Sequence, residues 1–304
     1  MNAELPRRAP GDFTIPAVAF GAGPVSALMT DASARTRQLA TIERAIAAGI
    51  DWFDTAATYG GGESERGLGA VLRDLRADVR VATKVRLENV GDIRESVKSS
   101  VAASLRRLGL PRVAMVQLHN SITARRGDLP TSVTPLDALA VFEAFEELRR
   151  DGLVQLFGMT GIGDAQALIE TMRGGPWTTV QVNFSLAEPD TTLLEAAREQ
   201  GIAALAIRVF AGGALSGQPP SEHTRTTKFF PLTIYARDVE RAETMQARLP
   251  AGLSLAEAAL RFAVHHSGVA SALIGFGSAE QVDDAVRWAL AGPLDTDLIA
   301  QLTT

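Results

Sequence analysis

Short apolar runs alternate with longer amphipathic segments along most of this chain. Continuous apolar runs are typical of strands that are buried on both faces of a parallel sheet. The runs predict eight strands, at residues 18–21, 51–54, 79–84, 113–119, 154–159, 180–184, 203–208 and 271–274.

The segments between these runs have the spacing of amphipathic helices. They predict helices at residues 33–48, 63–73, 92–108, 136–150, 164–173, 192–200, 255–266 and 279–290. Strands and helices that alternate in this way favour a closed (β/α)₈ barrel, also called a TIM barrel. We therefore expect residues 1–304 to form a single barrel domain.

Two connections are longer than the rest, at 120–134 after the fourth strand and at 209–232 after the seventh strand. Loops of this length in a compact domain are usually functional. An additional helix is predicted at 234–249, before the last strand-and-helix unit.

A doubly wound Rossmann sheet also alternates strands with helices, so it is the structural alternative. It requires Gly-x-Gly-x-x-Gly after the first strand. Here Gly21 and Gly23 are followed by Pro24, and Ser26 stands where the third glycine is needed. The barrel is therefore the better interpretation.

Composition narrows the class of protein. The chain has 304 residues, a net charge of −5 and no cysteine, which argues against a polyanion partner such as nucleic acid and against a disulfide framework or thiolate metal site. Arg7 and Arg8 precede no apolar segment, and no apolar run is long enough to span a membrane. We expect a soluble cytoplasmic protein; the oligomeric state stays open.

Chemically active side chains lie at or just beyond three successive predicted strands. Asp54, Lys84 and His119 each close a strand, and Tyr59 follows Asp54 by five residues. Strand ends of a barrel converge on one mouth, so these side chains are expected to meet there. A lysine ammonium stabilises a phenolate and lowers the pKa of a tyrosine, while a carboxylate holds the lysine charged. Asp54, Lys84 and Tyr59 therefore form a reasonable acid–base relay, and His119 could donate to a substrate carbonyl oxygen and orient it.

These residues carry a resemblance to a known family. The chain resembles the aldo-keto reductases in Asp-Thr-Ala-x-x-Tyr-Gly at 54–60, in Glu63, in Leu68-Gly69, in Lys84 and in Leu-His-Asn at 118–120. The likeness extends from an N-terminal hairpin near Phe13 to Ala289. It implies NAD(P)(H)-dependent interconversion of an aldehyde, ketone or aldose and an alcohol, without a metal.

The resemblance also assigns residues. Asp54, Tyr59, Lys84 and His119 would be the catalytic tetrad, with Tyr59 as the general acid or base. The cofactor would contact Gly21, Thr160, Gln181, Arg208, Phe210, Leu215, Ser216, Gly217, Gly275, Gly277, Ser278, Gln281 and Asp284. Relatives usually have Ser-Asn where this chain has Thr160-Gly161, so the amide is missing. Either Ile207 or Arg208 would pack on the nicotinamide.

NADP-preferring relatives place Arg or Lys where this chain has Gly277 and Gln281, which favours NAD over NADP. The segment 208–217 resembles the NAD-linked sugar dehydrogenases, so an aldose 1-dehydrogenase or a pyridoxal dehydrogenase is the specific hypothesis. A nucleotide-sensing regulatory subunit of the same fold is the alternative. A barrel hydrolase or isomerase that uses Asp54 and His119 without nicotinamide is a third possibility.

The remaining ionisable candidates have ordinary interpretations. His265 and His266 are adjacent, so a helix turns them about 100° apart and they are not a metal pair. His223 is expected at the surface, in a polar loop. Arg125 and Arg126 are interpreted as solvated loop residues.

Overall fold

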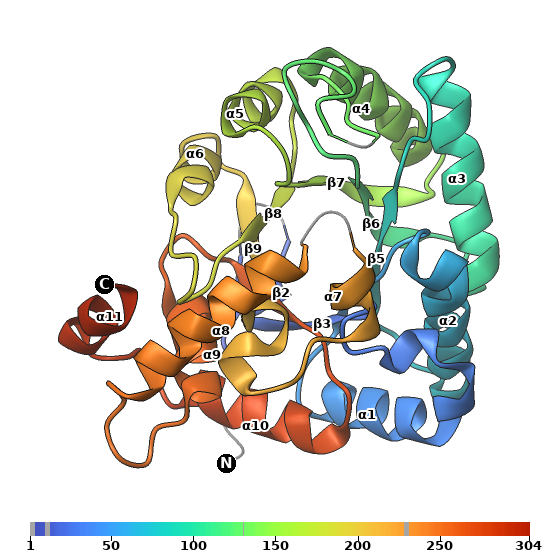
Figure 1. Cartoon of the computed structure of the whole chain (residues 1–304). Coiled ribbons are helices and arrows are strands. Elements are labelled where there is room, and N and C mark those ends of the chain that lie inside the picture. Colours follow the sequence, from blue (N-terminus) through green and yellow to red (C-terminus); the bar gives the residue numbers. More distant parts are fainter. Residues whose placement is uncertain (1–3, 10–12, 130, 228–230) are drawn as a thin grey trace.

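The computed structural model describes residues 4–9, 13–129, 131–227 and 231–304, and it shows a closed barrel of eight parallel strands (Figure 1). The barrel confirms the predicted fold, and the strands agree with the predicted ones to within a residue or two at each end. In chain order they are β3 (Val18–Gly21), β4 (Trp52–Asp54), β5 (Arg80–Val85), β6 (Val113–Leu118), β7 (Val154–Thr160), β8 (Thr179–Asn183), β9 (Ala203–Ile207) and β10 (Ser271–Ile274).

Helices surround the barrel as an outer ring (Figure 1). Those that follow the strands are α1 (Arg35–Ala47), α2 (Glu63–Leu75), α3 (Ile93–Leu108), α4 (Pro135–Arg150), α5 (Ala165–Gly174), α6 (Thr192–Glu199), α9 (Leu255–His265) and α10 (Ala279–Leu290). The predicted additional helix is α8 (Leu232–Gln246), which begins and ends slightly earlier than expected. Two helices were not predicted, α7 (Glu222–Thr226) and the C-terminal α11 (Thr296–Thr303).

Helix ends are set by local side-chain chemistry. The Asp92 carboxylate accepts a hydrogen bond from Glu95 N at 3.0 Å and caps α3. A reciprocal capping box between Thr134 and Asp137 begins α4, and Pro135 occupies its first turn. These contacts satisfy amide groups that lack a partner within the helix, so each helix begins at a defined residue.

The N-terminal hairpin pairs β1 (Arg7–Arg8) with β2 (Ile15–Pro16) in antiparallel register. Ile15 is fully buried in the barrel interior, and the ring of Phe13 packs on Trp52 with centroids 5.8 Å apart. The hairpin therefore closes the end of the barrel opposite to the C-terminal ends of the strands.

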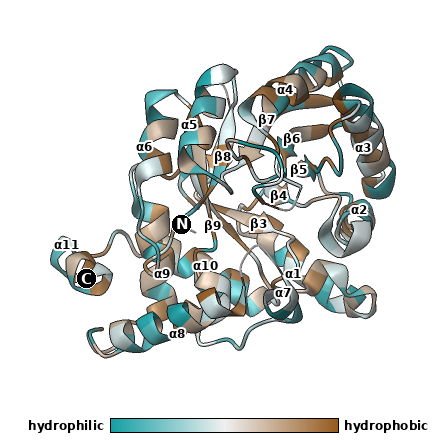
Figure 2. Cartoon of the chain, turned by 45° about the horizontal axis from the view of Figure 1, so that its top comes forward, coloured by the Kyte–Doolittle hydropathy of each residue, from teal (hydrophilic) through white to brown (hydrophobic). Residues whose placement is uncertain are grey.

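The strands carry two cores, one on each face. The outer core lies between the sheet and the helices, and Figure 2 shows hydrophobic strands at the centre with hydrophilic residues on the outer faces of the helices. The inner core fills the barrel with residues that include Trp52, Ala82 and Met115. Because side chains alternate between the two faces, the next inward residues are Asp54, Lys84 and Gln117. The side chains inside the barrel are thus apolar at the level of Trp52, Ala82 and Met115, and polar at the next level toward the mouth.

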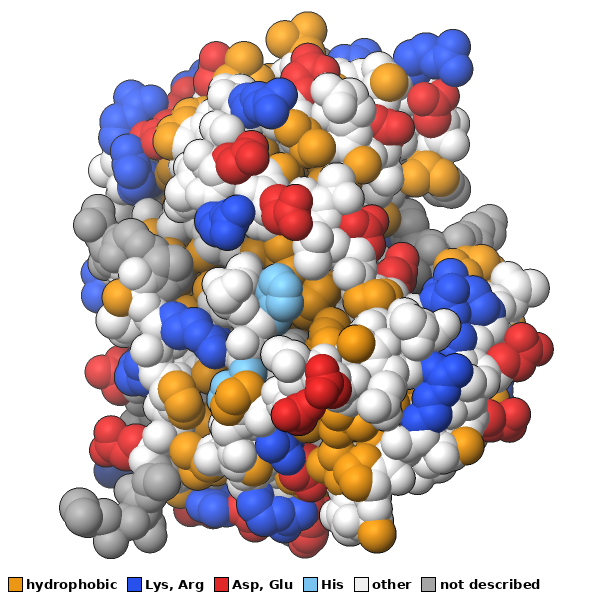
Figure 3. Space-filling model, turned by 90° about the vertical axis from the view of Figure 1, so that its left-hand side faces the viewer, with side chains coloured by type: hydrophobic (Ala, Val, Ile, Leu, Met, Phe, Trp, Pro, Cys, Tyr) orange, Lys and Arg blue, Asp and Glu red, His pale blue; other side chains and the backbone are white. Residues whose placement is uncertain are grey.

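Long segments follow β6 and β9, as predicted. The first reaches α4 without another helix, and the second contains the 3₁₀ turn η4 (Ala211–Ser216), α7 and α8. On the side face in Figure 3, basic and acidic side chains are interspersed. Within the described part of the chain, no helix is both long and apolar enough to cross a membrane.

Candidate functional site

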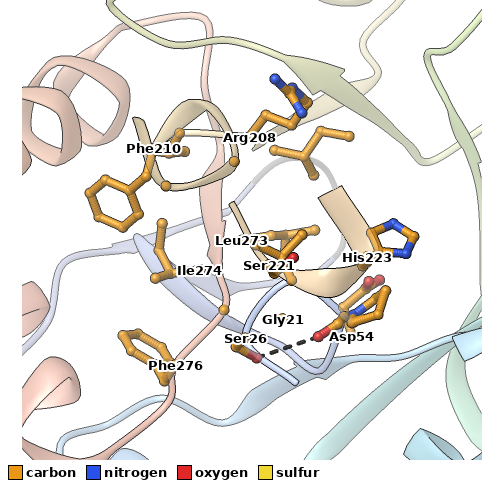
Figure 4. A pocket seen from close by; sticks show the side chains of 18 of the residues that line it. Gly21, Ser26, Asp54, Arg208, Phe210, Ser221, His223, Leu273, Ile274 and Phe276 are labelled. Atoms are coloured by element: carbon orange, nitrogen blue, oxygen red, sulfur yellow. Dashed lines mark hydrogen bonds between the residues drawn. The ribbon is translucent and has the colours of Figure 1, made fainter. Parts of the chain in front are cut away.

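A cavity of about 750 Å³ opens at the C-terminal mouth of the barrel. Its lining includes Asp54, Tyr59 and His119 at one end and Gln281 with Asp284 at the other. In the close view of Figure 4, Asp54 and His223 lie on one side, while Phe210 and Phe276 lie across from them. The volume falls in the range of small-molecule and cofactor sites.

Asp54 ends β4, and the residue is 4 % exposed. Lys84 Nζ donates to Oδ1, forming a buried ion pair. The side-chain amides of Gln117 and Gln181 donate to Oδ2 at 2.7 and 2.8 Å. Both carboxylate oxygens are therefore bound by donors from the neighbouring inward positions of the barrel.

Lys84 links Asp54 to Tyr59. Its ammonium donates to the Tyr59 hydroxyl at 3.3 Å and to the backbone oxygen of Thr55 at 3.0 Å. Tyr59 opens a 3₁₀ turn, η3 (Tyr59–Gly62), in which Gly60 and Gly61 have positive φ. This glycine-rich turn brings the phenol back over the strand end, which places Tyr59 in the cavity with its oxygen toward Lys84.

Burial and charge act in opposite directions on this group. Burial raises the pKa of Tyr59 above its ordinary value, and Lys84 only partly offsets that rise. Burial alone would lower the pKa of Lys84, but the Asp54 carboxylate and Tyr59 raise it overall. The expected influence of the lysine on the phenol is present, yet the net direction for Tyr59 is upward. In the protein without ligand, Tyr59 is therefore held in its protonated form.

His119 follows β6 and lines the same end of the cavity. Its backbone N–H donates to Val85 O at 2.8 Å, and Thr58 Oγ1 lies 3.3 Å from Nδ1. Its ring meets that of Tyr59 edge-on, with centroids 5.6 Å apart. Burial, with smaller contributions from Lys84 and Arg86, lowers the pKa of His119 well below its ordinary value. A neutral imidazole next to the phenol can donate one N–H to a ligand.

Most residues that the resemblance assigned to the cofactor line this cavity. They are Gly21, Thr160, Gln181, Arg208, Phe210, Ser216, Gly275, Gly277, Gln281 and Asp284. Three others, Leu215, Gly217 and Ser278, are not among the lining residues. Leu215 is fully buried, so its place in the structure is in the core behind the turn.

The predicted carboxamide end of the site departs from the family pattern for a structural reason. A Cβ at Gly161 would lie 2.8 Å from Gln181 O, so the backbone leaves no room for an asparagine. The Thr160 hydroxyl donates to Leu118 O at 3.2 Å, and the amide nitrogen of Gln181 donates to Asp54. The Thr160 hydroxyl hydrogen and one of the two amide hydrogens of Gln181 are therefore already used within the protein.

The turn after β9 forms one wall. Gly212 and Gly213 have φ of 72° and 110°, which lets the backbone fold tightly in front of the barrel. Ile207 faces the barrel interior, and Arg208 donates to Asp238 at 3.2 Å. Both line the cavity, but only Ile207 continues the inward face of β9.

The opposite wall follows β10. The side-chain oxygen of Gln281 accepts from Gly277 N at 2.7 Å, and Asp284 forms an ion pair with Arg287 at 2.7 Å. Among the described residues, the lysine and arginine side chains that line the cavity are Arg86 and Arg208. Neither belongs to this wall.

The structure also brings in residues that the sequence did not single out. His223, expected at the surface in a polar loop, is partly exposed, but it belongs to the short helix α7 and lines the cavity. Arg86 and Ser121 line the cavity beside His119. Arg126 instead pairs with Asp137, and the Arg125 side chain is 85 % exposed. Side chains along a strand alternate between its two faces. Arg86 and Ser121 stand two residues beyond Lys84 and His119, so this alternation could have predicted that they face the cavity.

Across the described ranges, no three His, Asp or Glu side chains gather closely enough to hold a metal ion. His265 instead contacts Ala289 O at 3.1 Å, and His266 packs on Phe184 with centroids 4.7 Å apart.

Residues 18–304 match the model of the Aldo/keto reductase family. The chain belongs to the aldo-keto reductase family. This aldo-keto reductase is 27 % identical to L-galactose dehydrogenase of Arabidopsis thaliana, over 90 % of this chain and 83 % of that protein. It is also 27 % identical to pyridoxal 4-dehydrogenase of Microbacterium luteolum, over 91 % of this chain and 90 % of that one.

Solved structures share its fold. An aldo/keto reductase from Klebsiella pneumoniae in complex with NADP and acetate superposes with a TM-score of 0.72. The comparison covers 99 % of this aldo-keto reductase and 94 % of that chain, at 23 % identity. At this identity the likeness concerns the fold alone.

Proposed function

We propose that this aldo-keto reductase interconverts a carbonyl compound and an alcohol by hydride transfer, with Tyr59 as the general acid or base. The contact that carries the proposal is that of Lys84 with both Asp54 and the Tyr59 hydroxyl, at the floor of an open cavity. Such a relay has no evident purpose in a core, because a buried ion pair costs desolvation.

A nicotinamide dinucleotide, when bound, supplies or accepts the hydride. Tyr59 then protonates the carbonyl oxygen in reduction and removes the hydroxyl proton in oxidation. Lys84 stabilises the phenolate that Tyr59 becomes, and Asp54 keeps Lys84 charged and in place. His119 donates an N–H to the same substrate oxygen. Its low pKa keeps it neutral, so it orients the oxygen without competing for the proton.

The cavity fits a dinucleotide in shape and in chemistry. It runs from Asp54 and His119 along the turn η4 to Gln281, and the buried hydroxyl of Ser121 forms no hydrogen bond within the described protein. Ile207 is the side chain we assign to packing on the nicotinamide ring, since it continues the inward face of β9. Gln181 would present its oxygen to the carboxamide while its nitrogen holds Asp54.

We further propose that NAD is the preferred dinucleotide. The carboxylate of Asp284 can accept hydrogen bonds from the hydroxyls of an unmodified ribose, and its pairing with Arg287 already engages the basic side chain next to it. No basic side chain lines that wall among the described residues, so a 2′-phosphate would find no counter-charge there. The NADP-bound aldo/keto reductase from Klebsiella pneumoniae is only 23 % identical to this chain, so its ligand does not decide between the two dinucleotides.

The first test of the chemistry is Tyr59→Phe. It should reduce turnover of a carbonyl panel by about 10²- to 10⁴-fold, because the proton donor is lost, while dinucleotide affinity changes little. Nicotinamide fluorescence measures binding, and absorbance of the reduced dinucleotide measures turnover. Turnover equal to that of the parent protein would remove Tyr59 from the mechanism.

A direct test of the cofactor is titration with NADH and with NADPH. Asp284→Lys should shift the preference toward NADPH. Asp283→Lys is the matched control, because it changes the net charge equally while Asp283 does not line the cavity and pairs with Arg44. Tighter binding of NADPH by the parent protein would contradict the assignment.

A further inference from the structure

Arg86 lies beside His119 at the mouth of the barrel. Lys84 pairs with Gln117 and Val85 with Leu118 in the parallel register of β5 and β6, and His119 N donates to Val85 O. Continuing this register places Arg86 next to His119. Because strand side chains alternate, Arg86 lies on the inward side, one level above Lys84.

Asn120 holds the backbone that carries Arg86. This asparagine is 1 % exposed, and its side chain accepts from Leu87 N at 2.8 Å and donates to Leu87 O at 2.8 Å. It also donates to Thr131 O at 2.7 Å. The residue that follows Arg86 is therefore clamped to the long loop after β6. This clamp fixes the direction in which Arg86 leaves the strand end.

Ser121 stands two residues beyond His119 and lines the same cavity. Its side chain is buried, with the residue 2 % exposed, and its hydroxyl has no hydrogen-bond partner within the described protein. A buried hydroxyl of this kind is costly unless something satisfies it. Its position in the cavity wall means that a ligand can do so.

Arg86 brings a positive charge to this end of the cavity. Asp54 and Lys84 offset each other as an ion pair. Arg86 Nε lies 3.5 Å from a carboxylate oxygen of Glu88, whose side chain is 68 % exposed, so water screens this pair. Arg86 also contributes to the low pKa of His119. A ligand next to His119 would thus meet a guanidinium and a hydroxyl.

We propose that Arg86 and Ser121 bind a carboxylate of the substrate, so that the preferred substrates are carbonyl compounds or alcohols that carry a carboxylate near the reacting carbon. This inference rests on the proposed function of the same cavity. A guanidinium presents a planar fork of N–H donors that matches a carboxylate, and the serine hydroxyl adds a further donor. His119 and Tyr59 would hold the reacting oxygen while Arg86 and Ser121 hold the acid group.

The test compares short ω-oxo acids, from glyoxylate to adipic semialdehyde, each with its own methyl ester. The two members of a pair have nearly the same shape and reactivity and differ in charge. In the parent protein, kcat/KM should favour the acid for at least one chain length. Arg86→Met should reduce the acid-to-ester ratio at that length by about 10- to 100-fold, with ester turnover changed little.

Further variants separate charge recognition from structural damage. Arg86→Lys should keep part of the preference, because it retains the charge and loses the planar fork. Ser121→Ala should lower the ratio less than Arg86→Met does. Arg125→Met is the matched control, since this arginine is exposed and does not line the cavity, and its ratio should equal that of the parent.

Two outcomes overturn the inference while leaving the proposed function intact. One is turnover of the esters with no preference for any acid, and the other is a preference that survives Arg86→Met. If the parent protein turns over neither member of any pair and no compound of the carbonyl panel, the proposed function fails. Succinate binding, measured by calorimetry on the parent and on Arg86→Met, then still tests the carboxylate site, and equal affinities would reject it.

Discussion

Gln117 donates a hydrogen bond from its side-chain nitrogen to Oδ2 of Asp54, across 2.7 Å in the interior of the barrel. Gln117 also stands beside Lys84 in the β5–β6 register. The glutamine therefore holds the carboxylate from one side while the lysine holds it from the other. This arrangement fixes the carboxylate plane, and through it the direction of the ammonium toward Tyr59.

Replacing Gln117 should weaken the contacts among Asp54, Lys84 and Tyr59 and should largely preserve dinucleotide binding in the cavity. Gln117→Met keeps a side chain of similar length and removes one buried donor, so we expect a loss of about 1 kcal/mol in unfolding free energy. Turnover should fall more than dinucleotide affinity, because Asp54 and Lys84 lose part of their orientation. Gln166→Met, at an exposed position of α5, is the control for both measurements. Unchanged turnover in Gln117→Met would show that Gln117 does not position Asp54 and Lys84 for the reaction.

The buried ion pair should be sensitive to the loss of one partner. Lys84→Met leaves the Asp54 carboxylate in the barrel interior without its counter-charge, and we expect about 3–5 kcal/mol of destabilisation. Arg35→Met removes the partner of Asp74 in an ion pair whose side chains are 34 % and 52 % exposed, and should cost about 1 kcal/mol or less. Chemical denaturation of both variants measures the difference, and equal losses would contradict the role of burial.

Stability should depend on pH through His119. Its pKa is lower in the folded protein than in the unfolded chain, so the unfolded chain binds more protons below pH 6.5. The stabilisation is complete above that pH and is lost as the pH falls. Between pH 7 and pH 5, His119→Gln should lose less unfolding free energy than the parent protein, because it lacks the imidazole that becomes protonated in the unfolded chain. Parallel pH profiles for parent and variant would refute the shift.

The absence of a side chain at position 161 should be essential to the barrel. Gly161→Ala brings a methyl group to 2.8 Å from Gln181 O, and overpacking of this kind costs about 1–3 kcal/mol. Gly174→Ala is the matched control, since no atom lies within 4 Å of its added Cβ. That change should be neutral or slightly stabilising, because it is in a helix. Thermal unfolding of the two variants decides, and an unaffected Gly161→Ala would mean that β7 moves easily.

The alternation of apolar and amphipathic segments was sufficient to predict the barrel, because each strand is buried on both faces. Spacing by one strand-and-helix unit also predicted that Asp54, Lys84 and His119 would meet. The helix α11 lies past the last strand-and-helix unit, where the repeating pattern gives no guidance, and it was missed. The position of His223 depends on how η4 and α7 fold over the barrel, which is a tertiary effect.

The direction of the Tyr59 pKa was also beyond the sequence. A neighbouring lysine can be inferred from spacing, but the extent of burial cannot, and burial outweighs the lysine. The same limit applies at Gly161, since the missing amide is visible in the sequence while the close approach of Gln181 O is not. Both the direction of the Tyr59 pKa and the lack of space at Gly161 depend on distances between chain segments, which the sequence does not give.

The clamp formed by Asn120 joins the loop after β5 to the loop after β6 by three hydrogen bonds to their backbones. Backbone groups are the same in every residue, so the side chains at Leu87 and Thr131 can be exchanged while the hydrogen bonds of Asn120 to their backbones persist. β5 carries Lys84 at one level, and Arg86 and His119 lie together at the next. Under the roles proposed for these residues, exchanging Arg86 would alter what the protein selects while the contacts of Lys84 with Asp54 and Tyr59 stay in place.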